Sequence, residues 1–545
     1  MGKVIARLIA GVATILLGVW FNYLIMPAWN IRSAGMWGFL LLMCIVGIIA
    51  FAIAEWIAGE YACEDCYYVF TGISGILSVI ILLILIIGGL TSAQMFNASN
   101  YHNIVEIEDG NFDTDIPIVT NEIPISIVDV GTAQKVGDRT IGSIKNATWY
   151  EVDDEYNLIK YQDGFYRISE LNYGGFWKYR KAKHHGIPGY VIVNAMTQEA
   201  KYIALDKPIK YSPSAHFSFK LERHLRNQYT GYIFGKSFFE INEEGTPFYI
   251  TSVKTPTIGC FGGKKELSFI ITNASTGESK EYKSEELPNW VDHAFDLDYL
   301  MEITNLNQKY VNGWWNISLF GSKTGVKSTS YQYRSVGFTG YNTTITSNGN
   351  IVFYTGVTPA NRAESNLGFI LANPKTGKIS YYECAGAEES SAQTAAEGLV
   401  SDLGFYATFP TVLNVDGAET YFMLLKDKAG LVQRYALCNI KDYTKVVQAE
   451  SFEGTLNLYK EKLGMQPPSV TEETFKTEGI IQNLYHTQID GSTYYCFTIE
   501  GSPDLYMSSI KNNYRQVWLK ENTRVTIEYK KSSEEGILLV HKIQF

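Results

Sequence analysis

Three long apolar stretches in the first 90 residues constrain the fold of this 545-residue chain more than any other feature. They run roughly over residues 4–26, 37–57 and 70–90. Each has close to the ~20 apolar residues with which a helix crosses about 30 Å of hydrocarbon. Aromatic residues stand near their ends, where such rings favour the lipid headgroup layer. The sequence therefore predicts a three-helix transmembrane anchor, residues 1–92, with the lipid bilayer as its partner.

Basic residues predict the orientation of this anchor. Lys3 and Arg7 precede or begin the first stretch, Arg32 lies in the first loop, and the second loop, 59–69, has neither Lys nor Arg. The positive-inside rule then places the N-terminus in the cytoplasm. Because three spans separate the two ends, we expect a multi-pass protein of the cell membrane whose C-terminal part is extracytoplasmic.

Beyond residue 100, acidic residues outnumber basic ones. Of the 46 Lys and Arg and the 56 Asp and Glu, only three and four lie in the first 100 residues, which leaves a net charge of −9 for the rest. An acidic surface repels phosphate backbones, and no basic stripe interrupts it. We therefore expect no nucleic acid among the partners.

Seven cysteines in so long a chain do not form a disulfide framework. Cys63 and Cys66 make a CxxC motif in the second loop, a spacing that suits a redox pair or half of a zinc site. No second CxxC and no nearby His completes a tetrahedral set, so we predict neither a metal nor a cofactor. The spacing alone leaves a redox role and a plain structural role open.

An apolar run that ends in a polar turn recurs in the rest of the chain. It covers residues 189–199, 268–278 and 368–378, and a degraded copy covers 434–444. In the first three copies a Thr follows the turn Asn by three residues. Asn can accept hydrogen bonds from the backbone just after it, and a following Gly accepts the positive φ that closes a hairpin. The sequence thus predicts repeated β-hairpins.

Helical signals follow each copy. They begin at Ser212, Asn289, Glu388 and about Glu453, where capping or acidic residues precede apolar ones on one face. We interpret residues 161–465 as about four units of strands followed by a helix, after a membrane-proximal α+β segment, 93–160. The copies are unevenly spaced, so a regular propeller or solenoid is not expected. The predicted fold class is membrane-anchored α+β.

The C-terminal part predicts a separate small domain. Residues 466–474 are rich in Pro and polar residues and indicate a linker. Five strand-like runs follow within 475–545, with the order and lengths of an OB-like β-barrel. Such a barrel could bind a nucleotide or sugar strand through Tyr494, Tyr506 or Tyr514, or these rings could simply fill and flank the sheet.

Trp314 and Trp315 are the best candidates for an exposed aromatic contact. Two adjacent side chains cannot both face inward on a strand, so one is expected to meet a partner or a sugar. The alternative is a Trp that lies against a neighbouring loop. With Tyr494 and Tyr506, these two residues make up the predicted partner contacts.

Catalytic motifs are not found. The sequence has no GxSxG, no GxxxxGK[ST] and no HExxH. Asp296 and Asp298 form a DxD without further oxygen ligands at a suitable spacing. Glu388, Glu389 and Glu397 could form a carboxylate cluster for acid–base work or calcium, but carboxylates also suit a helix N-terminus. We expect no catalytic residue.

Three passages, 261–292, 364–371 and 386–389, resemble an uncharacterised family of multi-pass membrane proteins of gut Clostridia with a β-rich extracytoplasmic domain. The resemblance covers roughly residues 90–450. It implies a bacterial cell envelope and carries no assigned activity. The Asn-x-x-Thr-Gly-Glu strand is also similar to PepSY-type modules, which are extracytoplasmic and often regulate proteases.

Together, these observations predict a non-enzymatic, membrane-tethered extracytoplasmic protein of the cell envelope that binds or scaffolds a protein or cell-wall partner. One alternative is a PepSY-like regulator of a membrane or secreted protease. The other is an envelope hydrolase with no recognised motif, which would need a concave pocket containing a perturbed carboxylate or His.

Overall fold

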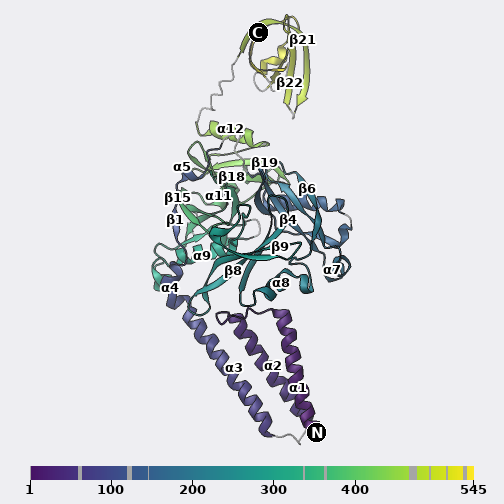
Figure 1. Ribbon diagram of the computed structural model, residues 1–545. Helices are drawn as coiled ribbons and strands as arrows, with labels where there is room; N and C mark the ends of the chain where they lie inside the picture. Colours follow the sequence, from purple (N-terminus) through teal and green to yellow (C-terminus); the bar gives the residue numbers. More distant parts are fainter. Residues whose placement is uncertain are drawn as a thin grey trace. The chain divides into compact units, whose positions relative to one another are not determined.

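The computed structural model describes residues 2–58, 64–119, 126–144, 146–335, 338–360, 365–464, 475–489, 492–510, 514–531 and 537–545. It divides into two compact units, Met1–Lys462 and Leu463–Phe545. The first unit holds the N-terminal helices and a β-rich body, and the second is a small barrel (Figure 1). The α+β fold class is confirmed. The predicted linker, 466–474, lies outside the described residues.

Three helices precede the body: α1 (Gly2–Ile25), α2 (Ala34–Ala58) and α3 (Glu64–Ser92). Helix α2 packs against both α1 and α3. Among the described residues, two segments are long and apolar enough to cross a membrane, Ala34–Ala54 and Gly72–Ser92. The apolar part of α1, Ile9–Ile25, is shorter.

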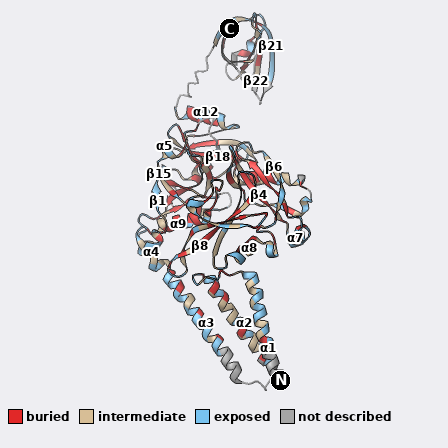
Figure 2. Ribbon diagram, viewed as in Figure 1, coloured by how far each residue is buried: buried red, intermediate tan, exposed pale blue. Residues whose placement is uncertain are grey.

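Of the three predicted spans, two therefore have a segment that is long and apolar enough, and the first does not. At ~1.5 Å per residue, Ile9–Ile25 of α1 is about 26 Å long, a little less than the ~30 Å of hydrocarbon. In each of the two candidate spans, Ala34–Ala54 and Gly72–Ser92, only 17% of the residues are buried, and the others are exposed or half-buried (Figure 2). The CxxC pair, Cys63 and Cys66, lies outside the residues whose side chains are described.

In the described residues the body contains four sheets, and each includes a four-stranded antiparallel meander. The first meander is β3 (Asn157–Tyr161), β4 (Gly164–Tyr173), β5 (Ile187–Asn194) and β6 (Ala200–Ile209). The second is β7 (Ile233–Ile241), β8 (Pro247–Ile258), β9 (Gly262–Asn273) and β10 (Ser279–Lys283). The third is β12 (Asn342–Ile345), β13 (Ile351–Pro359), β14 (Asn366–Ala372) and β15 (Ile379–Gly386). The fourth is β17 (Thr411–Val415), β18 (Ala418–Lys426), β19 (Val432–Asn439) and β20 (Val446–Ala449).

Four short strands extend these sheets. They are β2 (Tyr150–Val152) on β4, β1 (Ile107–Asp109) on β15, β11 (Lys327–Thr329) on β13 and β16 (Tyr406–Ala407) on β18. The meanders meet through their first and second strands, because β3 contacts β7 and β13, and β12 contacts β17. Buried aliphatic and aromatic side chains fill the space between the sheets and their covering helices.

The turn between the third and fourth strands of each meander has the predicted Asn chemistry. The Asn273 side chain accepts hydrogen bonds from the backbone N–H groups of Ser275 and Thr276 at 3.0 and 2.9 Å. Asn194, Asn373 and Asn439 occupy the same place in the other meanders and accept equivalent bonds. Gly277 adopts φ +79° to close its turn.

Helices connect and cover the sheets. They are α4 (Gln94–His102), α5 (Phe112–Asp115), α6 (Val130–Gly137), α7 (Phe176–Ala182), α8 (Leu221–Gln228), α9 (Leu297–Lys309), α10 (Gly313–Ile317), α11 (Glu389–Gly398) and α12 (Phe452–Lys462). Helices α11 and α12 begin where the sequence predicts.

Two predicted helix starts are wrong. The helix expected at Ser212 begins only at Leu221, because Phe217 takes φ +57° and interrupts the turn. The helix expected at Asn289 begins at Leu297. The chain before it is held extended, since the backbone N–H groups of Ala294 and Phe295 donate to Pro374 at 2.9 and 2.8 Å.

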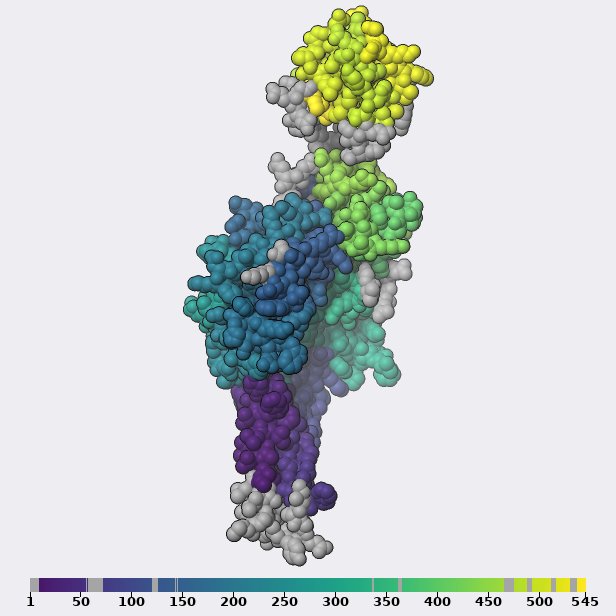
Figure 3. All heavy atoms as spheres, turned by 90° about the vertical axis from the view of Figure 1, so that its right-hand side faces the viewer, coloured from purple at the N-terminus to yellow at the C-terminus, as the bar shows by residue number. Residues whose placement is uncertain are grey.

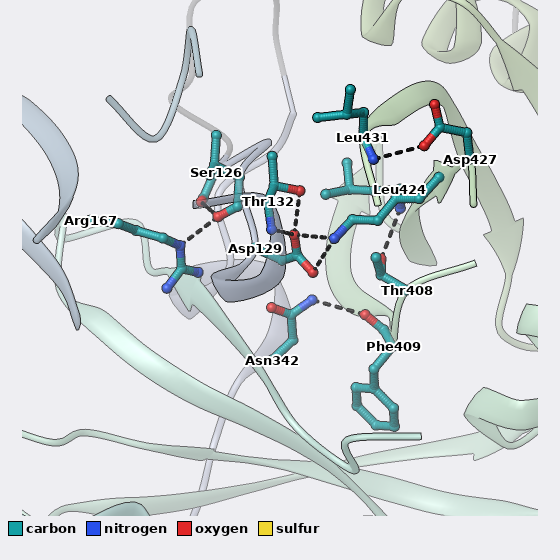
Figure 4. Close-up of polar contacts among 12 residues, drawn as sticks. Ser126, Asp129, Thr132, Arg167, Asn342, Thr408, Phe409, Leu424, Asp427 and Leu431 are labelled. Atoms are coloured by element: carbon teal, nitrogen blue, oxygen red, sulfur yellow. Dashed lines mark hydrogen bonds and ion pairs between the residues drawn. The ribbon is translucent and has the colours of Figure 1, made fainter. Parts of the chain in front are cut away.

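One segment before the meanders ties the first sheet to the last. The Lys426 Nζ on β18 lies 2.6 Å from Asp129 Oδ1, which also accepts from Thr132 (Figure 4). Burial raises the pKa of Asp129, but the Lys426 charge and these hydrogen bonds outweigh it and hold that pKa below its ordinary value. Buried Arg167, on β4, donates to the carbonyl of Val128 in the same segment. Residues 126–132 therefore join sheets that are far apart in the sequence.

The second unit is a closed five-stranded barrel with the strand order β21-β22-β23-β25-β24. Its strands are β21 (Phe475–Ile489), β22 (Ser492–Ile499), β23 (Leu505–Ser509), β24 (Arg524–Lys531) and β25 (Ile537–Gln544). The β23–β25 pair is parallel, whereas the other pairs are antiparallel. The five predicted strands are thus present, and closure leaves no free sheet edge.

Candidate functional site

The first unit contains a pocket of about 710 Å³ where the α1–α2 connector meets the first two sheets. Figure 3 shows the purple helices ending against the blue and teal surface of these sheets. One wall is mainly apolar and comes from the connector and α8 (Ile25, Met26, Ala28, Leu221, Leu225). The polar wall comes from β4, β7 and the chain before β3 (Asp153, Glu155, Glu170, Asn172, Lys236, Ser237), and β7 also contributes the apolar residues Ile233, Phe234 and Phe239. This volume lies in the range of small-molecule sites.

Hydrogen bonds hold the connector against the body. The backbone N–H of Trp29 donates to Thr230 at 2.9 Å, and the Asn30 side chain donates to Gly231 at 3.1 Å. Arg226 on α8 donates to the carbonyl of Met26 at 3.2 Å. The same guanidinium donates to the carbonyls of three residues that follow α8, Tyr229, Thr230 and Tyr232. The apolar wall is therefore fixed to the body.

Glu170 is the central group of the polar wall. It is 8% exposed, and its Oε2 accepts a hydrogen bond from the buried hydroxyl of Tyr249. Among the described contacts, none reaches its Oε1. Burial raises the pKa of Glu170 to about 8, the Tyr249 bond opposes this shift, and the charges of Asp153 and Glu155 add to it. The carboxyl is therefore mainly protonated at neutral pH.

The other polar groups of the wall already have hydrogen-bond or ion-pair partners within the protein. Glu155 lies 2.8 Å from the Nζ of Lys236. Burial lowers the pKa of Lys236, but this bond and charge outweigh the effect and raise it. Asp153 accepts from the backbone N–H of Glu155 at 2.7 Å and from the Asn172 amide. No described cation neutralises Asp153, so the wall carries an excess of negative charge.

A second buried carboxyl, Glu240 at the end of β7, differs from Glu170 in its partners. It accepts from the backbone N–H groups of Asp292, at 2.9 Å, and His293, and it lies 3.2 Å from His293 Nδ1. Burial raises the pKa of Glu240 to about 8 and lowers that of His293 to about 4. The two side chains thus form a neutral hydrogen-bonded pair at pH 7, outside the pocket.

The predicted Trp pair lies on helix α10, whereas the prediction assumed a strand. Trp314 is half-buried and stacks on Tyr310 with ring centroids 6.2 Å apart. Trp315 is 75% exposed. One ring therefore packs against a neighbour and the other is free to meet a partner.

The two predicted tyrosines of the barrel occupy different positions. Tyr506 is buried in the core, where it stacks on Phe497 with centroids 5.9 Å apart. It therefore cannot provide a surface contact. Tyr494 is half-buried on β22 beside Ser509 of β23.

The acidic candidates of the sequence do not come together. Glu389 is buried and accepts from Ser330 and Tyr354, each at 3.0 Å. Glu397 accepts from the backbone N–H of Ala407 at 2.9 Å. Asp298 accepts from the Tyr331 hydroxyl at 2.8 Å. In the part of the chain that the structure describes, no group of three His, Cys, Asp or Glu could hold a metal ion.

Neither the pocket nor Glu170 is predicted from the sequence. The available signal was a charged residue inside an otherwise buried strand, Ile168-Ser169-Glu170-Leu171. No protein-family model matches the chain, and no curated protein matches it. The assignment of the site therefore depends on its geometry.

Proposed function

We propose that this protein is a membrane-tethered, extracytoplasmic binding protein of the cell envelope whose ligand occupies the 710 Å³ pocket. One observation carries the proposal: the pocket is lined jointly by the connector of the apolar helices and by the first two sheets. A ligand there contacts both the anchor and the body.

The surface of the apolar helices supports the tethering. Apolar side chains gain free energy when they leave water, so a core helix of a water-soluble domain is mostly covered. Only 17% of each of the two candidate spans is buried. Lipid is the solvent in which such helices are stable. An extracytoplasmic body requires α1 to cross as well, because an odd number of spans must separate it from a cytoplasmic N-terminus. The apolar part of α1, Ile9–Ile25, lies at the short end of the length that crosses a bilayer, and Lys3 and Arg7 before it favour a cytoplasmic N-terminus.

The lining supports an amphiphilic ligand with a protonated amine. Glu170 and Asp153 lack a described cationic partner, and an ammonium group would satisfy the open Glu170 Oε1. The cation Arg226 already donates to four carbonyls, so an anionic ligand would compete with the bonds that hold the connector and the chain after α8. The apolar wall suits the hydrocarbon part of the same molecule. The amine can belong to a lipid headgroup or to a free soluble compound.

Ligand binding to the full-length protein in detergent micelles tests the proposal. Decylamine is expected to raise the Tm of the wild type, whereas decanol, which has the same chain and no charge, is not. Glu170→Gln is expected to weaken decylamine binding at least about tenfold, because an ammonium–carboxylate bond contributes on the order of 1.5–3 kcal/mol. The matched control Glu240→Gln changes a buried acid outside the pocket and is expected to leave the affinity unchanged.

Nanodiscs distinguish the two sources of the amine. If the ligand is a lipid, phosphatidylethanolamine nanodiscs raise the Tm over phosphatidylglycerol nanodiscs, and Glu170→Gln removes the difference. If it is soluble, decylamine shifts the Tm equally in both. Equal binding of decylamine by wild type and Glu170→Gln contradicts the pocket as the site.

A second candidate, an envelope hydrolase, is favoured by one observation. Glu170 is a protonated carboxyl inside a pocket, as a general acid requires. Purified protein would then hydrolyse cell-wall fragments or peptides, and Glu170→Gln would abolish the rate. A binding protein shows no such turnover.

Two features of the fold support a repeated unit in the body and an OB-like barrel in the second unit. The four meanders share one strand order and one Asn turn, which supports a unit repeated four times. The barrel order β21-β22-β23-β25-β24, with its parallel β23–β25 pair, supports an OB-like fold.

A further inference from the structure

An apolar loop follows helix α9 and is almost free of contacts at its tip. Leu319 and Phe320 are each 94% exposed, and Trp315 is 75% exposed. Grouped apolar side chains at such exposure are uncommon on a protein that meets only water, and they indicate a contact with a protein or a membrane.

The loop lies close to the end of the third apolar helix. Helix α10, which carries Trp315, contacts α4, and α4 begins two residues after α3 ends at Ser92. The Tyr310 hydroxyl donates to the Gln94 side chain at 2.5 Å and fixes this approach. Figure 1 shows α4 at the point where α3 enters the body. Met95 and Phe96 of α4 are also exposed, 47% and 67%.

The backbone of the loop is closed on itself. The Asn316 side chain donates to the carbonyl of Thr324 at 3.0 Å and accepts from its N–H at 3.1 Å. The N–H groups of Gly321 and Lys323 donate to Ser318 and Asn316 at 3.0 and 2.9 Å. A loop whose polar backbone groups are bonded internally can enter an apolar phase at lower cost than an open one.

From this geometry we infer that the loop of residues 313–323 inserts Trp315, Leu319 and Phe320 into the outer surface of the lipid bilayer that holds α2 and α3. The inference rests on the membrane tethering of the proposed function. The position of the loop favours lipid over a second copy of the chain as its partner. Because α10 contacts α4, the loop lies at the level where the candidate span of α3 ends, and Trp prefers this layer of the membrane. Lys323 at the loop's base can extend its ammonium to the headgroups.

Fluorescence of the full-length chain in vesicles tests the inference. A genetically encoded environment-sensitive fluorophore replaces Phe320, and the vesicles contain equal parts phosphatidylethanolamine and phosphatidylglycerol. With bromine on the acyl chains, the emission at position 320 is expected to shift to the blue and lose about half of its intensity, as for a side chain below the headgroups. A fluorophore at position 315 provides a second measurement if the first variant does not fold.

Position 403 is the matched control. Leu403 is an exposed apolar residue that follows α11, and α11 lies away from α4 (Figure 1). Its fluorophore is expected to keep its intensity in brominated vesicles. Unquenched emission at both 315 and 320 would overturn the inference, and so would an emission shift in detergent that depends on protein concentration, since that indicates a second copy.

A carbonate wash of the same vesicles separates this inference from the proposed function. Retained protein with an unquenched loop refutes only the loop's insertion. Protein that the wash releases refutes the tethering and the insertion together.

Discussion

Glu170 and Glu240 are two buried carboxyls with the same direction of pKa shift and opposite surroundings. The pKa of each is raised to about 8 by burial. Glu240 bonds two backbone N–H groups and a His, so its partners belong to the fold. Glu170 has one described side-chain partner, Tyr249, and lines a 710 Å³ pocket. The same direction of pKa shift therefore occurs in an acid bonded within the fold and in an acid beside a pocket, so a perturbed pKa alone does not identify a functional site.

Replacing each acid by Ala is expected to give the largest difference in stability loss between the two regions. Glu240→Ala leaves two backbone N–H groups buried without acceptors, at about 1–3 kcal/mol each. Glu170→Ala leaves only the Tyr249 hydroxyl, which water in the pocket can satisfy, and is expected to cost about 1 kcal/mol. Thermal unfolding of both variants in detergent measures the difference. Equal losses would show that Glu170 is as structural as Glu240.

The second largest expected effect is the contribution of Glu170 to the pH dependence of stability. The folded-state pKa of Glu170, about 8, lies above its ordinary value of 4.5, so the folded state binds the extra proton. Its stabilisation is complete below pH 4.5 and is lost as the pH rises to about 8. Glu170→Gln is expected to flatten this fall by at most about 1.4 kcal/mol per pH unit.

Unfolding measured from pH 5 to 8 in wild type and variant checks the slope. Bound decylamine is expected to flatten the wild-type curve as well, because a cation lowers the pKa of Glu170 and leaves that of Glu240 unchanged. Identical curves with and without decylamine would place the amine elsewhere.

The smallest expected effect concerns the hydroxyl pair in the same region, Ser237 and Thr251, whose oxygens are 2.7 Å apart. Ser237→Ala removes one hydrogen bond beside the pocket and is expected to cost about 0.5–1.5 kcal/mol. A Tm shift in detergent measures it. A larger loss of stability would mean that the hydrogen bonds of the polar wall are coupled to one another. The wall would then be as structural as the surroundings of Glu240.

The sequence predicts local features well and the pocket not at all. Asn273 and Gly277 define their turn within a few residues, so the turn follows from local chemistry. The barrel strands likewise follow from short apolar runs. The pocket walls come from residues 25–33, 153–172 and 213–251, and only the meeting of the sheets brings these together.

Glu170 and Glu240 illustrate this limit. Both stand among buried residues of a strand, as Ser169-Glu170-Leu171 and Phe239-Glu240-Ile241, so burial along the strand does not show which of them lines a pocket. Phe217 gives a second example, because its positive φ is imposed by the fold and interrupts a helix that the sequence favours.

The bond between Asp129 and Lys426 also sets an order of events during biosynthesis. Its two partners are separated by nearly 300 residues, so the acid emerges from the ribosome long before the amine. Until residue 426 has been made, Asp129 has no counter-ion there, and this ion pair does not yet join the first meander to the last. A chain truncated before β18 is therefore expected to be degraded by proteases even though its first three meanders are complete.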